Sequence, residues 1–157
     1  MHFNPNLKVI DIPGKGDGVI TTVGLKSNIP IYQFSGDLFS RETISHEYSL
    51  HIQIGLNKFM GPSGGIDDYI NHSCNPNCAL HIVGGRAILY TIMPIAAGTE
   101  ITYDYSVTSD DSKDDFNMKC NCKEHNCRKF ISGFKYLDDD TKKRYQDLNI
   151  VPKYILK

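Results

Sequence analysis

Residues 71–77 read Asn71-His72-Ser73-Cys74-Asn75-Pro76-Asn77, a dense run of amide, imidazole and thiol groups in the middle of the chain. Taken alone, the run predicts an Asn-rich turn, because Pro76 presets its own backbone dihedral and Asx side chains bond to their own backbone. Asn71 offers both donors and an acceptor, and His72 suits a ligand, a base or a packed residue. By itself, this chemistry favours a structural role for His72 over a functional one.

Outward from this run, three more cysteines stand in a C-x-C-x4-C pattern at Cys120, Cys122 and Cys127. Zinc prefers four soft ligands in a tetrahedron, so three thiolates require a fourth ligand from elsewhere. An odd count of five cysteines without a secretion signal argues against a disulfide framework. Three reduced cysteines in a metal-free loop are the less favoured alternative, since the spacing is tight. The candidates for the fourth ligand are Cys74, Cys78 and His125.

Two further stretches carry polar or flexible residues in a distinctive order. Residues 98–105 read GTEITYDY and alternate strongly enough to predict a strand over Glu100–Tyr105. In such a strand Tyr103 and Tyr105 share one face and Asp104 points away. The other stretch, Gly14-Lys15-Gly16-Asp17-Gly18, is a flexible turn that allows close approach to a ligand, although a turn between strands is the commoner use.

The composition describes an ordinary globular protein. The 157 residues fit one domain, and 40% of them are hydrophobic and 22% charged. A formal net charge of -1 gives no strong field for nucleic acid. No signal peptide is predicted at Met1–Asn6, and the apolar stretch 87–97 is too short to span a bilayer. We therefore expect an intracellular protein that binds neither nucleic acid nor membrane.

Local patterns predict a mainly β fold with few short helices. Gly84-Gly85 lies between two strand-like runs and predicts a hairpin. A helix is predicted at Asp138–Leu148, with acidic residues at its start, and a second at Asp37–Ser45. The polar stretch Ser106–Lys119 is interpreted as a surface loop. The other predicted strands are Leu7–Ile12, Gly18–Val23, Pro30–Ser35, Tyr48–Ile54, Ala79–Val83 and Arg86–Ile92.

Taken together, the four stretches resemble one protein family. The order G-x-G, N-H-S-C-x-P-N, E-I-T-Y-D-Y and C-x-C-x4-C-R is similar to that of the SET-domain protein-lysine methyltransferases with a post-SET zinc knuckle, in a minimal single-domain form. The resemblance covers roughly residues 9–131. It implies a fold of several small sheets in which the segments around Asn71 and Tyr105 lie side by side as a pseudoknot. It also implies a SET domain at 7–110, a zinc-bound post-SET knuckle at 116–132 and a helical tail at 133–157.

The same resemblance implies an activity and a set of site residues. The expected reaction moves a methyl group from S-adenosylmethionine to the side-chain amine of a lysine in a protein or peptide, histones included, and leaves S-adenosylhomocysteine. Tyr105 takes the catalytic role, and Tyr103 lines the lysine channel, which favours mono- and di-methylation. Cys78 is left as a spare thiol. The zinc ligands implied are Cys74, Cys120, Cys122 and Cys127. The cofactor-binding residues implied are Lys15, Gly16, Asp17, Gly18, Asn71, His72 and Tyr105.

Three positions depart from the family pattern. Phe34, in Phe34-Ser35-Gly36-Asp37, stands where the family often has a tyrosine; Asp68 stands where many members have an arginine; and Asp17 sits between glycines where a bulky residue is common. These departures keep a second hypothesis open: a catalytically weak SET module that serves as a protein-binding platform. A zinc-knuckle nucleic-acid binder is a third, disfavoured because no basic, aromatic stripe is present.

Overall fold

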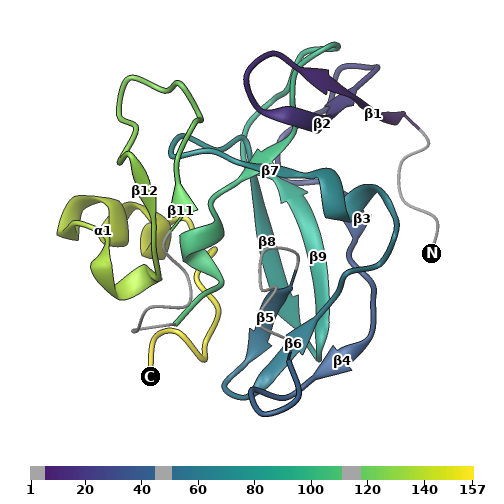
Figure 1. The fold of residues 1–157 in the computed structure, drawn as a ribbon. Coiled ribbons are helices and arrows are strands. Elements are labelled where there is room, and N and C mark those ends of the chain that lie inside the picture. The colour runs from purple at the N-terminus through teal and green to yellow at the C-terminus, as the bar shows by residue number, and fades with distance from the viewer. Residues whose placement is uncertain (1–5, 45–50, 111–117) are drawn as a thin grey trace.

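In the part of the chain that the structure describes, the strands form five small sheets, none of more than three strands (Figure 1). The computed structural model describes residues 6–44, 51–110 and 118–157. The strands are β1 (Leu7–Ile12), β2 (Gly16–Thr21), β3 (Pro30–Gln33), β4 (Leu38–Phe39), β5 (Ile52–Gly55), β6 (Lys58–Met60), β7 (Asn71–His72), β8 (Cys78–Val83), β9 (Arg86–Thr91), β10 (Thr102–Tyr103), β11 (Met118–Lys119) and β12 (Phe130–Ile131). The helices are the short 3-10 helices η2 (Ile66–Tyr69), η3 (Tyr105–Val107) and η4 (Phe134–Tyr136) and the α-helix α1 (Asp139–Asp147). The mainly β prediction is confirmed.

Four of the sheets are antiparallel and one is parallel. β1 pairs with β2, β11 with β12, β3 and β8 flank β9, and β4 and β5 flank β6, all antiparallel. β7 and β10 pair in parallel, so the segments around Asn71 and Tyr103 lie side by side, as the pseudoknot requires. The predicted hairpin at Gly84-Gly85 is confirmed, because it joins β8 to β9 with φ angles of 58° and 75°. Those left-handed angles suit glycine and match the twist of a two-residue turn.

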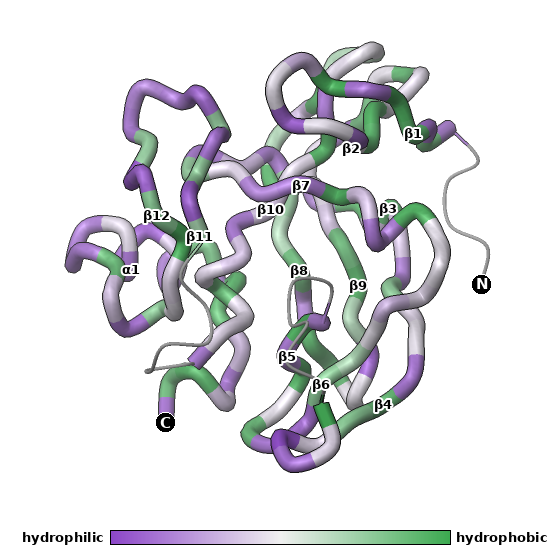
Figure 2. Tube along the Cα trace, viewed as in Figure 1, coloured by the Kyte–Doolittle hydropathy of each residue, from purple (hydrophilic) through white to green (hydrophobic). Residues whose placement is uncertain are grey.

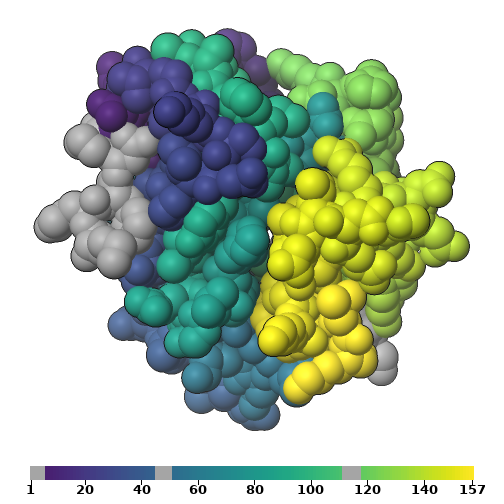
Figure 3. Space-filling view, turned by 180° about the vertical axis from the view of Figure 1, so that it is seen from behind, coloured from purple at the N-terminus to yellow at the C-terminus, as the bar shows by residue number. Residues whose placement is uncertain are grey.

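Three hydrophobic clusters are found among the described residues, of which two pack the sheets and the tail and the third surrounds the cysteines and Ile131. The larger cluster fills the space between the sheets, and its fully buried members include Val19, Ile31, Leu89 and Ile101. The hydropathy view shows the apolar run along β9 (Figure 2). The second cluster packs the chain after residue 133 against Ala79 of β8 and beside η3. Figure 3 shows this C-terminal segment, in yellow, covering the molecule beside β8 and β9 on the face turned away in Figure 1. The tail is therefore part of the folded body.

Two predicted elements are corrected by the structure. The helix predicted at Asp37–Ser45 is wrong over its described part, 37–44: Leu38 and Phe39 form β4 and pair with Met60 and Phe59. The strand predicted at Glu100–Tyr105 shortens to Thr102–Tyr103. After it, the Asp104 side chain accepts a hydrogen bond from the Ser106 amide and starts η3. Pairing with β6 therefore overrides the helix prediction, and the Asp104 cap ends the predicted strand early.

Other predicted boundaries are partly confirmed. The strand predicted at Tyr48–Ile54 is seen from Ile52 onward, and residues 45–50 lie outside the described residues. The loop predicted at Ser106–Lys119 is wrong at both described ends, because Ser106 is fully buried and residues 118–119 form β11; residues 111–117 are not described. The helix predicted at Asp138–Leu148 is confirmed as α1, with Asp138 as its N-cap. In the described part of the chain, no helix has the length and apolar character to cross a membrane.

Candidate active site and cysteine cluster

The parallel pair β7–β10 brings two of the motif stretches together. The Ser73 amide donates to the Tyr103 carbonyl at 3.1 Å. Asn77 reinforces the pairing with its side chain, because its Oδ1 accepts from the Thr102 amide at 3.0 Å and its Nδ2 donates to the Glu100 carbonyl at 2.7 Å. An asparagine amide can satisfy one donor and one acceptor of a neighbouring strand in this way. These contacts fix the backbone of residues 100–105 against the turn that follows β7.

The glycine-rich turn joins this pair through a polar cluster. Asn71 Nδ2 donates to the Asp17 carbonyl and to Glu100 Oε1, both at 2.9 Å. Lys15 Nζ lies 2.6 Å from Glu100 Oε2, with both side chains under one-fifth exposed. Gly18 leaves room for these contacts, since a Cβ there would lie 2.7 Å from Asn71 Nδ2. The structure thus brings together Lys15, Asp17, Gly18 and Asn71, with Glu100 as the residue that joins them.

His72 lies against Cys74 of the cysteine cluster. Its ring is buried, and burial, with the Asp104 carboxylate opposing, lowers its pKa to about 4, so the imidazole is neutral at pH 7. The Tyr105 amide can only donate, and it lies 3.2 Å from Nδ1, so Nδ1 accepts. The proton then sits on Nε2, which lies 3.3 Å from Cys74 Sγ. This tautomer is assigned from the neighbouring groups.

A row of aromatic rings lies beside His72. The Tyr103 and Tyr105 ring centroids are 4.9 Å apart, so the two rings lie side by side, although Tyr105 belongs to η3 and not to the predicted strand. Phe34 meets Tyr103 edge to face at 5.8 Å, and Tyr105 meets His72 at 5.3 Å. The Tyr105 hydroxyl donates to the Ile70 carbonyl at 2.7 Å. Burial raises the pKa of both tyrosines, so their hydroxyls stay protonated.

Four of the five cysteines form one cluster. The sulfur atoms of Cys74, Cys120, Cys122 and Cys127 all lie within 4.8 Å of one another. The Cys74 and Cys120 sulfurs are 3.7 Å apart, close to the S···S distance of about 3.8 Å that Zn–S bonds of 2.3 Å give in a tetrahedron. Although burial opposes it, hydrogen bonds with the Cys74 and Glu124 backbones lower the pKa of Cys122 to about 7. The thiol set therefore fits a zinc ion, and Cys78 is buried elsewhere, in β8.

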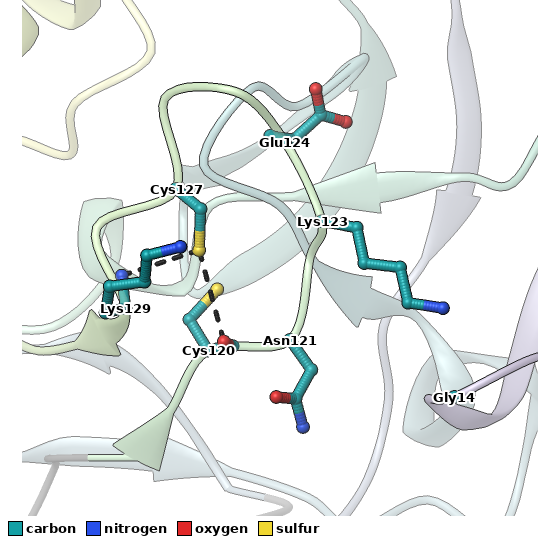
Figure 4. A pocket seen from close by; sticks show the side chains of 7 residues that line it. All are labelled: Gly14, Cys120, Asn121, Lys123, Glu124, Cys127 and Lys129. Atoms are coloured by element: carbon teal, nitrogen blue, oxygen red, sulfur yellow. Dashed lines mark hydrogen bonds between the residues drawn. The ribbon is translucent and has the colours of Figure 1, made fainter.

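A cavity of about 370 Å³ separates the cysteine cluster from the glycine-rich turn. In Figure 4 the Lys123 side chain reaches from the cluster towards Gly14. Its Nζ donates to the Pro13 carbonyl at 2.7 Å and so closes one side of the cavity. The volume is within the range of small-ligand pockets, which begins at about 300 Å³. Its lining residues are Gly14, Cys120, Asn121, Lys123, Glu124, Cys127 and Lys129.

Several residues of the site were not among those singled out from the sequence. Glu100 and Asp104 stand inside the GTEITYDY stretch, and Arg128 directly follows the last cysteine of the cluster, so the motifs themselves carried a signal for them. Arg128 Nη2 donates to Asp104 Oδ1 at 2.8 Å. The Tyr145 hydroxyl donates to Asp104 Oδ2 at 2.7 Å, and no motif marks Tyr145.

Comparison with known proteins agrees with this geometry. The model of the SET domain family matches residues 16–106, more than half of the chain. The chain belongs to the SET domain family. The match runs from Gly16 in the glycine-rich turn to the residue after Tyr105, so it contains the aromatic row, the parallel pair and the polar cluster except Lys15.

Individual relatives extend the comparison beyond this SET domain. The probable histone-lysine N-methyltransferase set-23 of Caenorhabditis briggsae is 27% identical over 146 residues, which are 80% of this chain and 60% of that protein. The H3 lysine-4 specific histone-lysine N-methyltransferase of Saccharomyces cerevisiae is 29% identical over 133 residues, 82% of this chain and 12% of that protein. The chain thus spans 60% or less of the length of these two relatives.

A solved structure confirms the SET fold. A crystal structure of KRYPTONITE, in complex with mCHG DNA and SAH, superposes with a TM-score of 0.69 at 24% identity, covering 84% of this chain and 30% of that one.

Proposed function

We propose that this SET domain transfers a methyl group from S-adenosylmethionine to the side-chain amine of a lysine in a protein. The observation that carries the proposal is the parallel β7–β10 pair, which places Asn71 next to the segment of the two tyrosines. The Asn71 side chain in turn donates to the Asp17 carbonyl, so the glycine-rich turn lies at the same pair of strands. Relatives named as histone-lysine methyltransferases support the activity. The S-adenosylhomocysteine in the KRYPTONITE complex supports the cofactor.

In this proposal the turn and the strand pair hold the cofactor. Lys15, Gly16, Asp17, Gly18, Asn71, His72 and Tyr105 form the binding set. When bound, S-adenosylmethionine supplies an activated methyl group on a cationic sulfur. The fit rests on Lys15, whose ammonium carries three N–H donors and uses one of them on Glu100 Oε2, so that it can also bind a carboxylate. Both N–H groups of Asn71 Nδ2 already donate, to the Asp17 carbonyl and to Glu100 Oε1, and Asn71 therefore shapes the turn that would hold the cofactor. The cavity lined by Gly14 and the knuckle is proposed to hold the rest of the molecule, because Gly14 directly precedes the binding set; none of the seven residues of that set lines it.

The two tyrosines align the acceptor lysine. A free lysine has a pKa of about 10.4 and must lose a proton before its nitrogen can attack. The buried aromatic row of Phe34, Tyr103 and Tyr105 disfavours the charged ammonium by desolvation. The Tyr105 hydroxyl donates a hydrogen bond to the Ile70 carbonyl, and a hydroxyl oxygen oriented in this way can accept weak C–H···O contacts from a methyl group. Alignment, more than a dedicated base, supplies the rate enhancement.

The cysteine cluster is proposed as a zinc site with a structural role. Residues 116–132 form a post-SET knuckle in this reading, with 7–110 as the SET domain and 133–157 as the tail. Cys74 lies in the SET part, so zinc would join the knuckle to the turn after β7. The knuckle also lines the cavity, which ties zinc binding to cofactor binding.

The substrate class follows from the relatives. They include H3 lysine-4 and H3 lysine-36 specific enzymes, and one KRYPTONITE structure contains an H3(1–15) peptide. We therefore propose a lysine in a histone-like basic peptide and an intracellular, nuclear setting. A catalytically weak binding platform is the second candidate, and Phe34 favours it because its ring places no hydroxyl beside Tyr103.

The decisive test is methyl transfer from isotopically labelled S-adenosylmethionine to mixed core histones and basic peptides. Wild-type protein should label an acceptor, and Tyr105→Phe should label it at least about a hundredfold more slowly, as expected when alignment is lost. Tyr90→Phe, on β9, is the matched control and should retain full activity.

Calorimetry with S-adenosylmethionine separates the two candidates. If no acceptor is labelled and S-adenosylmethionine does not bind, the enzyme proposal is disproved and the binding platform is favoured. Binding without labelling of these acceptors would disprove the histone-like substrate class while retaining the cofactor site.

A further inference from the structure

Asp104 is a fully buried carboxylate placed between the two tyrosines of the candidate site. Its side chain is 0% exposed. Burying an isolated charge is costly, so such a carboxylate needs charged or hydrogen-bonding partners. Its partners are the Ser106 amide at 3.0 Å, Arg128 Nη2 at 2.8 Å and the Tyr145 hydroxyl at 2.7 Å. Each of these three groups donates a hydrogen bond to the carboxylate, and His72 Nδ1 also lies 3.4 Å from its Oδ1.

Each partner comes from a different part of the chain. Ser106 belongs to η3, Arg128 follows the cysteine cluster, and Tyr145 lies in the middle of α1. Burial and the Asp104 charge raise the pKa of Tyr145, so its hydroxyl keeps the proton that it donates. Tyr145 is itself fully buried in the tail cluster. One carboxylate therefore connects the tail, the knuckle and the start of η3, where Tyr105 lies.

The connection continues into the cysteine cluster. The Arg128 side chain is held by Asp104 and by Ser106 Oγ at 3.1 Å, and the backbone amide of the same residue donates to Cys74 Sγ at 3.4 Å. On the other side of Asp104, the Tyr105 amide donates to His72, whose Nε2 faces the same sulfur. Asp104 is thus joined to Cys74 through Arg128, and Tyr105 is joined to Cys74 through His72. Groups that act on a ligand through a hydrogen bond commonly set its orientation.

We propose that Asp104 is a positioning residue, and that α1, through the Tyr145 hydroxyl, holds the knuckle and Tyr105 in the geometry needed for methyl transfer. This inference rests on the proposed function for its catalytic part. It assigns a role to residues 138–157, which pack outside the candidate site. It also predicts that loss of one hydroxyl in α1 loosens the cysteine cluster selectively.

The test compares Tyr145→Phe with Ile150→Val. Tyr145→Phe removes only the hydroxyl that Asp104 accepts, whereas Ile150→Val removes one buried methylene from the same tail cluster without touching Asp104. Both variants should lower the melting temperature by a similar few degrees. Asp104→Asn is a poorer choice, because it leaves the Arg128 guanidinium without its buried counter-charge.

The first readout is the rate at which each cysteine reacts with N-ethylmaleimide, resolved by peptide mass spectrometry. The fully buried Cys78 reports general opening of the fold, and the four clustered cysteines report loosening of the knuckle. In Tyr145→Phe the clustered cysteines should react about tenfold faster than in wild type while Cys78 changes little, as expected for loss of one hydrogen bond to a charged group. In Ile150→Val all five rates should change together.

The second readout is methyl transfer to core histones. Tyr145→Phe should lower kcat about tenfold with KM for the histone nearly unchanged, because positioning is lost and binding is not. Parallel acceleration of Cys78 and the clustered cysteines in Tyr145→Phe, or a kcat equal to that of Ile150→Val, would overturn the inference. Absence of methyl transfer by the wild type would count against the proposed substrate class. The rates at which the cysteines react with N-ethylmaleimide would still decide whether Asp104 holds the knuckle.

Discussion

At the scale of single residues, Tyr103 is proposed to limit the room beside the methyl acceptor. It is 5% exposed and lies between the rings of Phe34 and Tyr105. A hydroxyl there holds a water or the amine and crowds out more highly methylated forms. Tyr103→Phe should therefore shift the product from mono- and di-methylation towards tri-methylation in peptide mass spectrometry. An unchanged product distribution would remove Tyr103 from the lysine channel.

Two cysteines four positions apart have opposite expected roles. Cys74 lies in the thiol cluster, whereas Cys78 is buried in β8 with the larger hydrophobic cluster. Native mass spectrometry should find one zinc ion in the wild type and in Cys78→Ala, and none or weakly bound zinc in Cys74→Ser, since a structural site needs all four ligands. A wild-type mass equal to that of the bare chain would refute the zinc site.

At the scale of elements, the β1–β2 turn depends on the absence of a side chain at Gly18. A Cβ there would lie 2.6 Å from Ile12 Cγ1 and 2.7 Å from Asn71 Nδ2. Gly18→Ala should displace Asn71 and weaken S-adenosylmethionine binding about tenfold, with about 1–3 kcal/mol lost from stability by overpacking. Calorimetric titration and thermal melting measure the two effects.

Gly24→Ala is the control for that substitution. The nearest atom to its added Cβ is the Ile95 carbonyl oxygen at 3.9 Å, an ordinary contact. It should bind S-adenosylmethionine as the wild type does. Equal affinities in all three proteins would show that the glycine-rich turn does not contact the cofactor.

The start of α1 gives a pH-dependent prediction. Asp138 accepts hydrogen bonds from the Thr141 amide at 2.8 Å and the Thr141 hydroxyl at 2.7 Å, which lower the pKa of its carboxyl. A lowered folded-state pKa contributes stability above the unfolded value of about 3.9 and loses it as the pH falls. Asp138→Ala should lower the melting temperature at pH 7 and at pH 5, and this difference should narrow only as the pH falls below about 3.9. Asp140→Ala, which lacks the cap bonds, should melt nearly as the wild type does; an equal loss in both variants would contradict the cap.

At the scale of the whole molecule, zinc removal tests how the parts depend on one another. The proposed ion would join the turn after β7 to the knuckle, and the knuckle lines the cavity. Treatment with a strong chelator should therefore lower the melting temperature and the affinity for S-adenosylmethionine together, because metal binding contributes to the folding free energy. Readdition of zinc under reducing conditions should restore both. Unchanged affinity after proven metal loss would separate the knuckle from the cofactor site.

Local patterns predicted elements where local chemistry decides the structure. The Gly84-Gly85 hairpin and the acidic start of α1 are examples, since backbone angles and capping suffice. The helix prediction at Asp37–Ser45 was wrong because Leu38 and Phe39 pair with Met60 and Phe59 of β6. A local sequence pattern carries no information about such a distant partner. Short strands such as β7 carry almost no periodic signal of their own.

The candidate site shows the same division. The glycine-rich turn, Asn71, the tyrosines and the four cysteines were predicted, because each lies in a compact motif. Glu100 and Asp104 were overlooked inside a predicted motif, since their roles depend on which partners meet them. Tyr145 had no sequence signal, because its meaning comes from one contact across 41 positions of the chain.

The contact between Lys123 and the Pro13 carbonyl has a consequence for turnover. It joins segments 110 positions apart at the edge of the cavity, through an exposed ammonium group. If the cofactor enters from this side of the cavity, both S-adenosylmethionine and the product S-adenosylhomocysteine must pass the exposed hydrogen bond between Lys123 and the Pro13 carbonyl. Such a bond breaks at little cost, so exchange can be fast while the buried chemistry behind it stays rigid. The rate of cofactor exchange and the precision of substrate alignment then depend on different parts of the fold.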